Sequence, residues 1–208
     1  MARVGILGGT FNPPHIAHLV CASEAAAQLG LDRVLLTPVA MPPHKQASGD
    51  PGPAERLELC RLAIAGDARL DLCDLEVVRG GASYTSDTLR ELHARSPQAE
   101  LTFILGADIA LGLETWREPE AVLELATLAI AERTGAGHDE IAAHLEQAFG
   151  GRARLCFFDM PRIDVSSSEI RRRVRDGRPI RHLVPGAVAE RIERLGLYRE
   201  RSDHGSRQ

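Results

Sequence analysis

Short apolar runs alternate with helical patterns along almost the whole chain, and this alternation limits the possible folds most strongly. The runs predict strands at 3–8, 33–39, 101–105, 128–131 and 154–158, with an extended segment at 70–78. Helical spacing of apolar residues predicts helices at 15–29, 54–65, 85–94, 118–125, 138–149, 167–175 and 185–194. This order favours an α/β fold, a doubly wound parallel sheet with helices on both faces and a small helical end. In such sheets ligands bind beyond the carboxyl ends of the strands, where the strand order reverses.

Length, charge and cysteine usage narrow the class of protein further. The 208 residues suffice for a single domain, 1–208, with a frayed tail expected at 202–208. A net charge of -4 and a pI near 6.1 argue against a protein that binds nucleic acid or anionic membranes through its whole surface. No apolar run reaches the ~20 residues of a membrane span, and the first apolar segment is too short for a signal peptide. The four cysteines form no CxxC pair, so we interpret them as buried free thiols and expect a cytoplasmic protein.

The junction after the first strand, GGTFNPPHIAH at 8–18, has the features of an anion site. Gly8 and Gly9 let the backbone turn sharply and approach a ligand closely. The helix that follows offers unpaired N–H groups to a phosphate. His15 and His18 are three positions apart, so they share one face of the first helical turn and can stabilise a phosphate whose charge grows. Either histidine alone also fits a structural turn, and the absence of GxGxxG leaves a dehydrogenase without support.

A second polar cluster, VSSSEIR at 165–171, opens a late helix. Serine with glutamate downstream is a common helix start, and that structural interpretation stays open. Clustered hydroxyls, free backbone N–H groups and the guanidinium of Arg171 equally suit a polyanion. The arginines that follow Arg171 are expected to form a solvated face.

These two strings resemble the HxGH and ISSTxIR motifs of the nucleotidylyltransferase superfamily, with Ala17 and Ser168 as the departures from those patterns. The resemblance implies a Rossmann-like nucleotide-binding fold, shared with class I aminoacyl-tRNA synthetases. It implies that His15 and His18 stabilise the α-phosphate of ATP and that Arg171 holds the leaving pyrophosphate. The ATP site expected from it comprises Gly8, Gly9, Thr10, Phe11, His15, His18, Ser167 and Arg171.

Three further segments bear on the second substrate: PPHK at 42–45, SYTSDTL at 83–89, and GAD at 106–108 with Trp116 further on. Lys45 on a stiff proline turn suits a phosphate monoester, or is an exposed loop lysine. The helix start at Thr85 suits a small carboxylate, or is a plain N-cap. Trp116, the only tryptophan, suits stacking on a flat ring, or belongs to the core.

As a set, these segments are similar to the bacterial nicotinate-mononucleotide adenylyltransferases, from about Arg3 to Tyr198. The resemblance implies that Trp116 stacks on the nicotinate ring, and that Thr85 and the backbone N–H of Arg117 take its carboxylate. It places His44 and Lys45 near the acceptor phosphate, and Gly106 and Asp108 at the adenosine part of ATP.

The implied function is adenylyl transfer from ATP to nicotinate mononucleotide, giving nicotinate adenine dinucleotide and pyrophosphate in NAD biosynthesis. Mg²⁺ is expected with ATP as co-substrate, and no metal is expected on a carboxylate cage of the protein. ATP and nicotinate mononucleotide are the expected partners, and association into a homo-oligomer stays open. The alternatives are a phosphopantetheine adenylyltransferase, nicotinamide mononucleotide as the acceptor, a non-catalytic nucleotide sensor, and a synthetase fragment.

Overall fold

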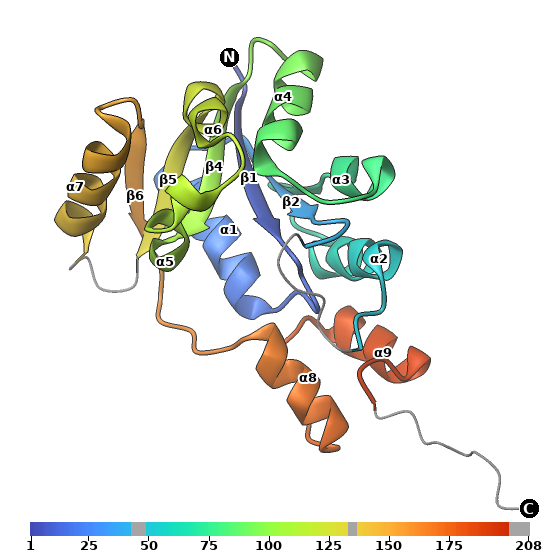
Figure 1. Ribbon diagram of the computed structural model, residues 1–208. Helices are drawn as coiled ribbons and strands as arrows, with labels where there is room; N and C mark the ends of the chain where they lie inside the picture. Colours follow the sequence, from blue (N-terminus) through green and yellow to red (C-terminus); the bar gives the residue numbers. More distant parts are fainter. Residues whose placement is uncertain (43–48, 133–136, 200–208) are drawn as a thin grey trace, which may run out of the picture.

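A six-stranded parallel sheet forms the centre of the protein. The computed structural model describes residues 1–42, 49–132 and 137–199 (Figure 1). The strands are β1 (Arg3–Gly9), β2 (Arg33–Pro38), β3 (Leu70–Leu72), β4 (Glu100–Gly106), β5 (Ala126–Glu132) and β6 (Leu155–Asp159). They lie in the order β3-β2-β1-β4-β5-β6, and every pair of neighbours is parallel. The predicted doubly wound sheet is confirmed.

The strand order reverses at β1. The chain passes from β1 outward to β2 and β3, and then returns to pair β4 on the other side of β1. Connections on the two sides of β1 therefore diverge and leave a crevice at the carboxyl ends of β1 and β4. Gly8 and Gly9, at the end of β1, pair with Thr37 and Pro38 of β2 and lie at this crevice.

Helices cover both faces because residues along each central strand alternate between two apolar clusters. Phe103 and Leu105 of β4 belong to the cluster that also contains Leu89 and Leu123, whereas Ile104 belongs to the cluster with Ala22. The first face is covered by α3 (Leu75–Arg79), α4 (Thr85–Arg95), α6 (Pro119–Leu125) and α7 (His138–Phe149). The second face is covered by α1 (Ile16–Gln28) and α2 (Pro53–Ala63).

The two last helices lie beyond the carboxyl ends of the strands, below the sheet in Figure 1. They are α8 (Ser167–Arg175) and α9 (Gly186–Leu195). A third apolar cluster joins them to α2 through Leu59, Ile170, Val188 and Ile192, all of them at most 2% exposed. The predicted helical end is thus present, and it packs at the edge where ligands are expected. No helix in the described part of the chain is long and apolar enough to cross a bilayer.

The structure corrects the prediction of an extended segment at 70–78. Only Leu70–Leu72 pairs as a strand, and Leu75–Arg79 forms the short helix α3. The run was ambiguous because its apolar residues fit both periods, and the amide of Val78 donates to the oxygen of Asp74 as in a helix. The structure also adds α5 (Ala107–Ala110) and the 3-10 turn η1 (Leu113–Thr115), which the sequence did not predict. The predicted tail at 202–208 lies outside the described residues.

Candidate active site

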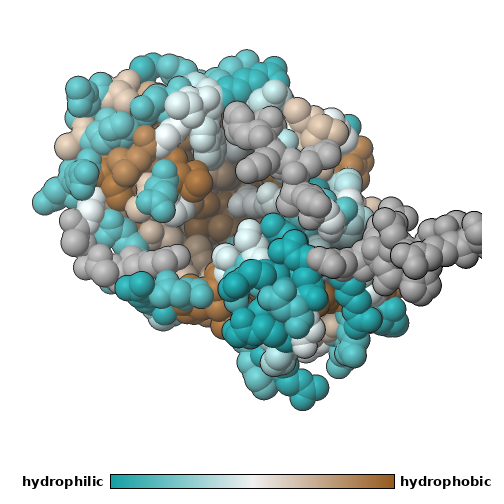
Figure 2. Space-filling view, turned by 60° about the horizontal axis from the view of Figure 1, so that its bottom comes forward, coloured by the Kyte–Doolittle hydropathy of each residue, from teal (hydrophilic) through white to brown (hydrophobic). Residues whose placement is uncertain are grey.

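A cleft of about 760 Å³ opens between the carboxyl ends of β1 and β4. Its apolar floor includes Ile6, Leu89, Phe103 and Leu105. Figure 2 turns the lower side of Figure 1 forward and shows a hollow with a hydrophobic floor on this side of the molecule. The predicted site residues that line the cleft are Gly8, Gly9, Thr10, Thr85, Gly106, Trp116 and Arg117. The structure therefore brings together residues from four separate segments of the chain.

One wall of the cleft suits a flat ring that carries a small anion. Trp116 packs edge-to-face on Phe103, with ring centroids 5.8 Å apart, and this contact fixes the indole at the cleft. The backbone N–H groups of Thr85 and Arg117 have no hydrogen-bond partner among the described residues. The guanidinium of Arg117 lies 4.5 Å from the ring centroid of Tyr84 and 3.5 Å from a carboxylate oxygen of Asp87.

The two motif histidines form a stacked pair at the start of α1. Their ring centroids are 3.7 Å apart with an interplanar angle of 25°, and Phe11 contacts the His18 ring edge-on at 4.9 Å. The backbone N–H of His15 donates to Nδ1 of His18 at 3.1 Å. Since Nδ1 accepts this bond, the proton of the neutral His18 ring lies on Nε2, which can donate to a phosphate oxygen.

Both histidines are held neutral at physiological pH. Burial lowers the pKa of His15 from 6.5 to about 4. Burial, and secondarily the charge of His15, lower the pKa of His18 to about 3. Nδ1 of His15 is also buried without a hydrogen-bond partner among the described residues. The pair therefore offers hydrogen bonds from neutral imidazoles, not a fixed positive charge.

The prediction that the start of α1 offers its unpaired N–H groups needs correction. The amide of His15 donates to the His18 ring, and the amide of Ile16 donates to the oxygen of Leu183 at 3.0 Å. Neither of these two amides is therefore available to a ligand. Leu183 precedes α9, so the C-terminal segment fastens the start of α1 in place.

Helix α8 is bonded directly to the turn after β1. The hydroxyl of Ser167 donates to the oxygen of Pro13 at 2.8 Å, and Nη1 of Arg171 donates to the oxygen of Asn12 at 2.7 Å. Ser166 caps the helix by accepting from the amide of Glu169 at 3.2 Å, as the serine-rich start predicted. The two predicted phosphate motifs, about 150 residues apart in sequence, thus meet at the turn after β1. Gly8, Gly9 and Thr10 of this region line the cleft, whereas His15, His18, Ser167 and Arg171 are not among its lining residues.

The remaining predicted residues lie elsewhere. Phe11 is 2% exposed, and its ring packs into the core against Gly9 and the ring of His18. Asp108 is exposed on α5 and is not among the residues that line the cleft. His44 and Lys45 lie outside the described residues.

Arg56 is the residue that the sequence interpretation missed. It is 1% exposed and donates to three backbone oxygens, those of Thr10 (2.9 Å), Val39 (2.7 Å) and Ala40 (2.8 Å). Its Nε also pairs with Asp50 at 3.1 Å. This buried cation therefore joins the turn after β1 to the segment after β2. Its position in the apolar pattern of α2, among buried Leu59, Cys60 and Ala63, was the signal available in the sequence.

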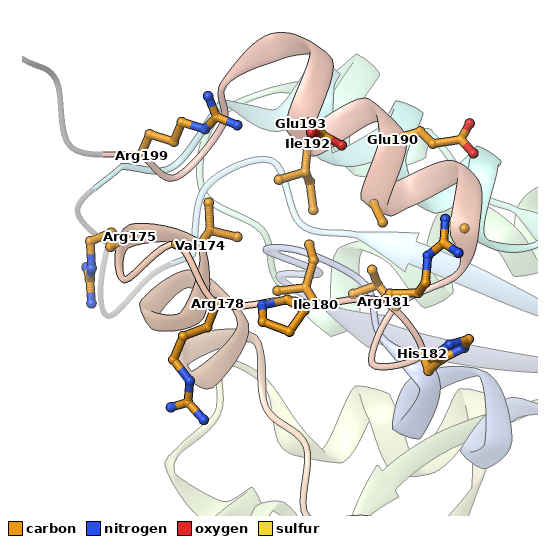
Figure 3. Close-up of a pocket in the computed structure, with 15 residues that line it drawn as sticks. Val174, Arg175, Arg178, Ile180, Arg181, His182, Glu190, Ile192, Glu193 and Arg199 are labelled. Carbon is orange, nitrogen blue, oxygen red and sulfur yellow. The ribbon is translucent and has the colours of Figure 1, made fainter.

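A second hollow, of about 830 Å³, lies between α8 and α9, and neither motif histidine lines it. Figure 3 shows that its arginines point in different directions, so they do not converge on one ligand position. Within the described residues, no group of three or more His, Cys, Asp or Glu is placed to hold a metal ion. The four cysteines are free, and burial raises the pKa of Cys21 to about 11, which keeps that thiol protonated.

A doubly wound sheet, with a histidine pair next to the turn to which a late arginine-bearing helix is bonded, fits the nucleotidyltransferase arrangement that the sequence predicted, and comparison with known proteins agrees. The chain belongs to the cytidylyltransferase-like family, whose pattern matches residues 6–173.

Within this family the chain is a member of the nicotinate-nucleotide adenylyltransferases. It is 41% identical over 198 residues to a probable nicotinate-nucleotide adenylyltransferase of Desulfitobacterium hafniense, covering 95% of this chain and 96% of that protein. It is 44% identical over 198 residues to one of Thermus thermophilus, covering 95% of this chain and all of that protein.

Solved structures support the same fold. The nicotinic acid mononucleotide adenylyltransferase of Plasmodium falciparum, complexed with NaAD, superposes with a TM-score of 0.76 at 20% identity, covering 95% of this chain and 98% of that one. A putative nicotinate-nucleotide adenylyltransferase of Vibrio parahaemolyticus gives a TM-score of 0.67 at 22% identity, covering 97% and 98% of the two chains.

Proposed function

We propose that the protein transfers the adenylyl group of ATP to nicotinate mononucleotide, forming nicotinate adenine dinucleotide and pyrophosphate. The observation that carries this proposal is the joining of the two motifs: His15 and His18, at the start of α1, directly follow the turn to which Ser167 and Arg171 are bonded. An α-phosphate beside the histidines and a β,γ-pair beside Arg171 then occupy one continuous anion site. The names of the family relatives support the same acceptor.

The reaction is a direct displacement. An oxygen of the mononucleotide phosphate forms a bond to the α-phosphorus of ATP, and the bond from that phosphorus to the bridging oxygen breaks. Pyrophosphate leaves with the bonding electron pair, so no proton transfer from the protein is needed to balance the step. The neutral His18 donates from Nε2 to the α-phosphate oxygens as their charge grows, and Arg171 stabilises the leaving group. The protein thus contributes positioning and charge stabilisation.

Mg²⁺ would enter with ATP. Because no described cluster of protein ligands suits a metal, the phosphates themselves would be its main ligands, and the ion would neutralise part of their charge. A requirement for added Mg²⁺ in the assay tests this part of the proposal.

The wall of the cleft that carries Thr85, Trp116 and Arg117, called the acceptor wall, favours nicotinate mononucleotide over its amide, nicotinamide mononucleotide. The free backbone N–H groups of Thr85 and Arg117 are hydrogen-bond donors. Both can pair with a carboxylate, because each of its two oxygens is an acceptor. A carboxamide presents an NH₂ group to one of them and leaves a donor facing a donor. The guanidinium of Arg117 adds attraction for a negative ring substituent.

The deciding experiment measures pyrophosphate release with Mg-ATP and either nicotinate mononucleotide or nicotinamide mononucleotide. We expect turnover with the acid and a kcat/KM at least about tenfold lower with the amide. Equal rates would remove the assignment of Thr85 and Arg117 while leaving adenylyl transfer intact. No turnover with either mononucleotide would overturn the proposed function. We also propose a cytoplasmic location, which the four free cysteines support.

A further inference from the structure

Glu76 is a buried carboxylate on the wall of the cleft that the reaction scheme leaves unused. It lies on α3, is 5% exposed and is among the residues that line the cleft. Burial raises its pKa, while the hydrogen bond from Thr88 and the charge of Arg79 oppose that rise. An apolar side chain would fill this position without the desolvation free energy that a buried carboxylate costs, so packing alone does not explain a glutamate here.

One carboxylate oxygen of Glu76 is hydrogen-bonded to helix α4. The hydroxyl of Thr88 donates to Oε1 of Glu76 at 2.7 Å, and Nη2 of Arg79 donates to the same hydroxyl oxygen at 3.1 Å. Thr88 lies one helical turn after Thr85, which lines the cleft and whose N–H is assigned to the nicotinate carboxylate. The carboxylate therefore fixes the rotation and depth of the first turn of α4.

The other carboxylate oxygen of Glu76, Oε2, is buried without a hydrogen-bond partner among the described residues. The hydroxyl of Ser83, close to this carboxylate, accepts from the amide of Ala40 at 2.9 Å. The amide of Ser83 donates to the oxygen of Met41 at 3.1 Å, and Met41 and Ala82 form a parallel bridge. The segment that leads into PPHK is thus bonded to the residue that leads into α4.

We propose that Glu76 is a positioning residue for the acceptor, which holds the start of α4 and the segment after β2 in one arrangement. This inference rests on the proposed function, because it assigns the α4 side of the cleft to the mononucleotide. The ATP phosphates are assigned to the turn after β1 and to α8, which Glu76 does not contact. Loss of Glu76 therefore weakens acceptor binding and leaves ATP binding almost unchanged.

The experiment compares steady-state kinetics of the wild type with those of Glu76→Ala, Glu76→Gln and Thr88→Val, varying each substrate separately. We expect Glu76→Ala to raise the KM for nicotinate mononucleotide about tenfold or more, with the KM for ATP changed by less than about twofold. Glu76→Gln keeps an oxygen that accepts from Thr88, so it should restore most of the loss. Thr88→Val keeps the shape, removes the hydroxyl and should resemble Glu76→Ala.

Glu91→Gln is the matched control. Glu91 pairs with the same Arg79 at 3.3 Å, but it lies on the outer part of α4 and does not line the cleft. We expect its kinetics to equal those of the wild type. Thermal unfolding of every variant separates instability from altered binding.

The outcomes separate the inference from the function on which it rests. A wild type without turnover of nicotinate mononucleotide would overturn the proposed function and the inference with it. An active wild type whose Glu76 variants lose thermal stability but keep the acceptor KM would overturn the inference alone. An equal rise in both KM values, or no rescue by Glu76→Gln, would also overturn it. If Glu76→Ala fails to fold, the Glu76→Gln and Thr88→Val variants test the inference through the same comparison of the KM for nicotinate mononucleotide with the KM for ATP.

Discussion

The guanidinium of Arg171 donates a hydrogen bond of 2.7 Å to the backbone oxygen of Asn12, which lies 159 positions earlier in the chain. Ser167, one turn before Arg171 on α8, donates to the next residue, Pro13, at 2.8 Å. The late helix is therefore fastened to the turn that presents the histidine pair. Arg171 has a structural bond and a proposed phosphate contact in the same side chain, and its substitution affects both.

Arg171→Ala should reduce kcat/KM for ATP on the order of a hundredfold, because the leaving pyrophosphate loses its cation and α8 loses a bond to the turn. Steady-state kinetics with varied ATP measures the effect. Arg175→Ala is the control: Arg175 is on the same helix, exposed, and lines only the second hollow. Equal loss in both variants would contradict a specific role for Arg171.

His18→Ala should lower kcat by about a hundred- to a thousandfold while the protein stays folded, since the ring provides the donor to the α-phosphate. Single-turnover product formation, with circular dichroism on the same sample, checks both statements. A variant that turns over at a near-normal rate would remove His18 from the catalytic step.

The free energy of unfolding should fall as the pH falls, because the imidazoles of His15 and His18 are buried in the neutral form. The folded-state pKa values of His15 (about 4) and His18 (about 3) lie below the ordinary 6.5, so the unfolded chain binds protons first as pH falls. The stabilisation is complete above pH 6.5 and is lost as the pH falls toward 4 and 3, by up to about 1.4 kcal/mol per pH unit for each ring. Urea unfolding at a series of pH values measures this slope.

The slope should become shallower in His18→Gln, which removes one of these titrating groups. His93→Gln, at an exposed position on α4, should keep the wild-type slope. Identical slopes in all three proteins would show that the buried pair does not set the acid sensitivity.

Arg56→Ala should destabilise the fold by about 3 kcal/mol or more, because three backbone oxygens and Asp50 lose their shared buried donor. Arg61→Ala, five residues later on α2, removes an ion pair with Glu58 whose arginine side chain is 60% exposed, and should leave the free energy of unfolding almost unchanged. Chemical denaturation of both variants provides the comparison. Similar losses would mean that burial does not distinguish these two arginines.

Trp116→Ala should raise the KM for nicotinate mononucleotide about five- to tenfold, through loss of a stacking surface, and Trp116→Phe should keep most of the affinity. The KM for ATP should stay constant in both variants. A matching rise in the ATP value would place Trp116 at the adenosine side of the cleft instead.

The sequence predicted the sheet and most helix positions because buried parallel strands and amphipathic helices leave clear periods in their residues. It predicted the meeting of 8–18 with 165–171 only through the resemblance, since no local pattern reports which distant segments touch. The same limit explains Arg56 and Glu76. Each is a charged residue with apolar neighbours in sequence, and its burial depends on partners that approach from other segments. The short helix at Leu75–Arg79 was mistaken for a strand continuation because its few apolar residues fit a strand period as well as a helical one.

The bond from Ile16 to Leu183, together with those from Arg171 and Ser167, also sets the timing of assembly during synthesis. The last strand of the sheet ends at Asp159, but the start of α1 acquires its partner only when Leu183 has been added. A nascent chain can therefore complete its sheet on the ribosome while its anion site stays unfinished.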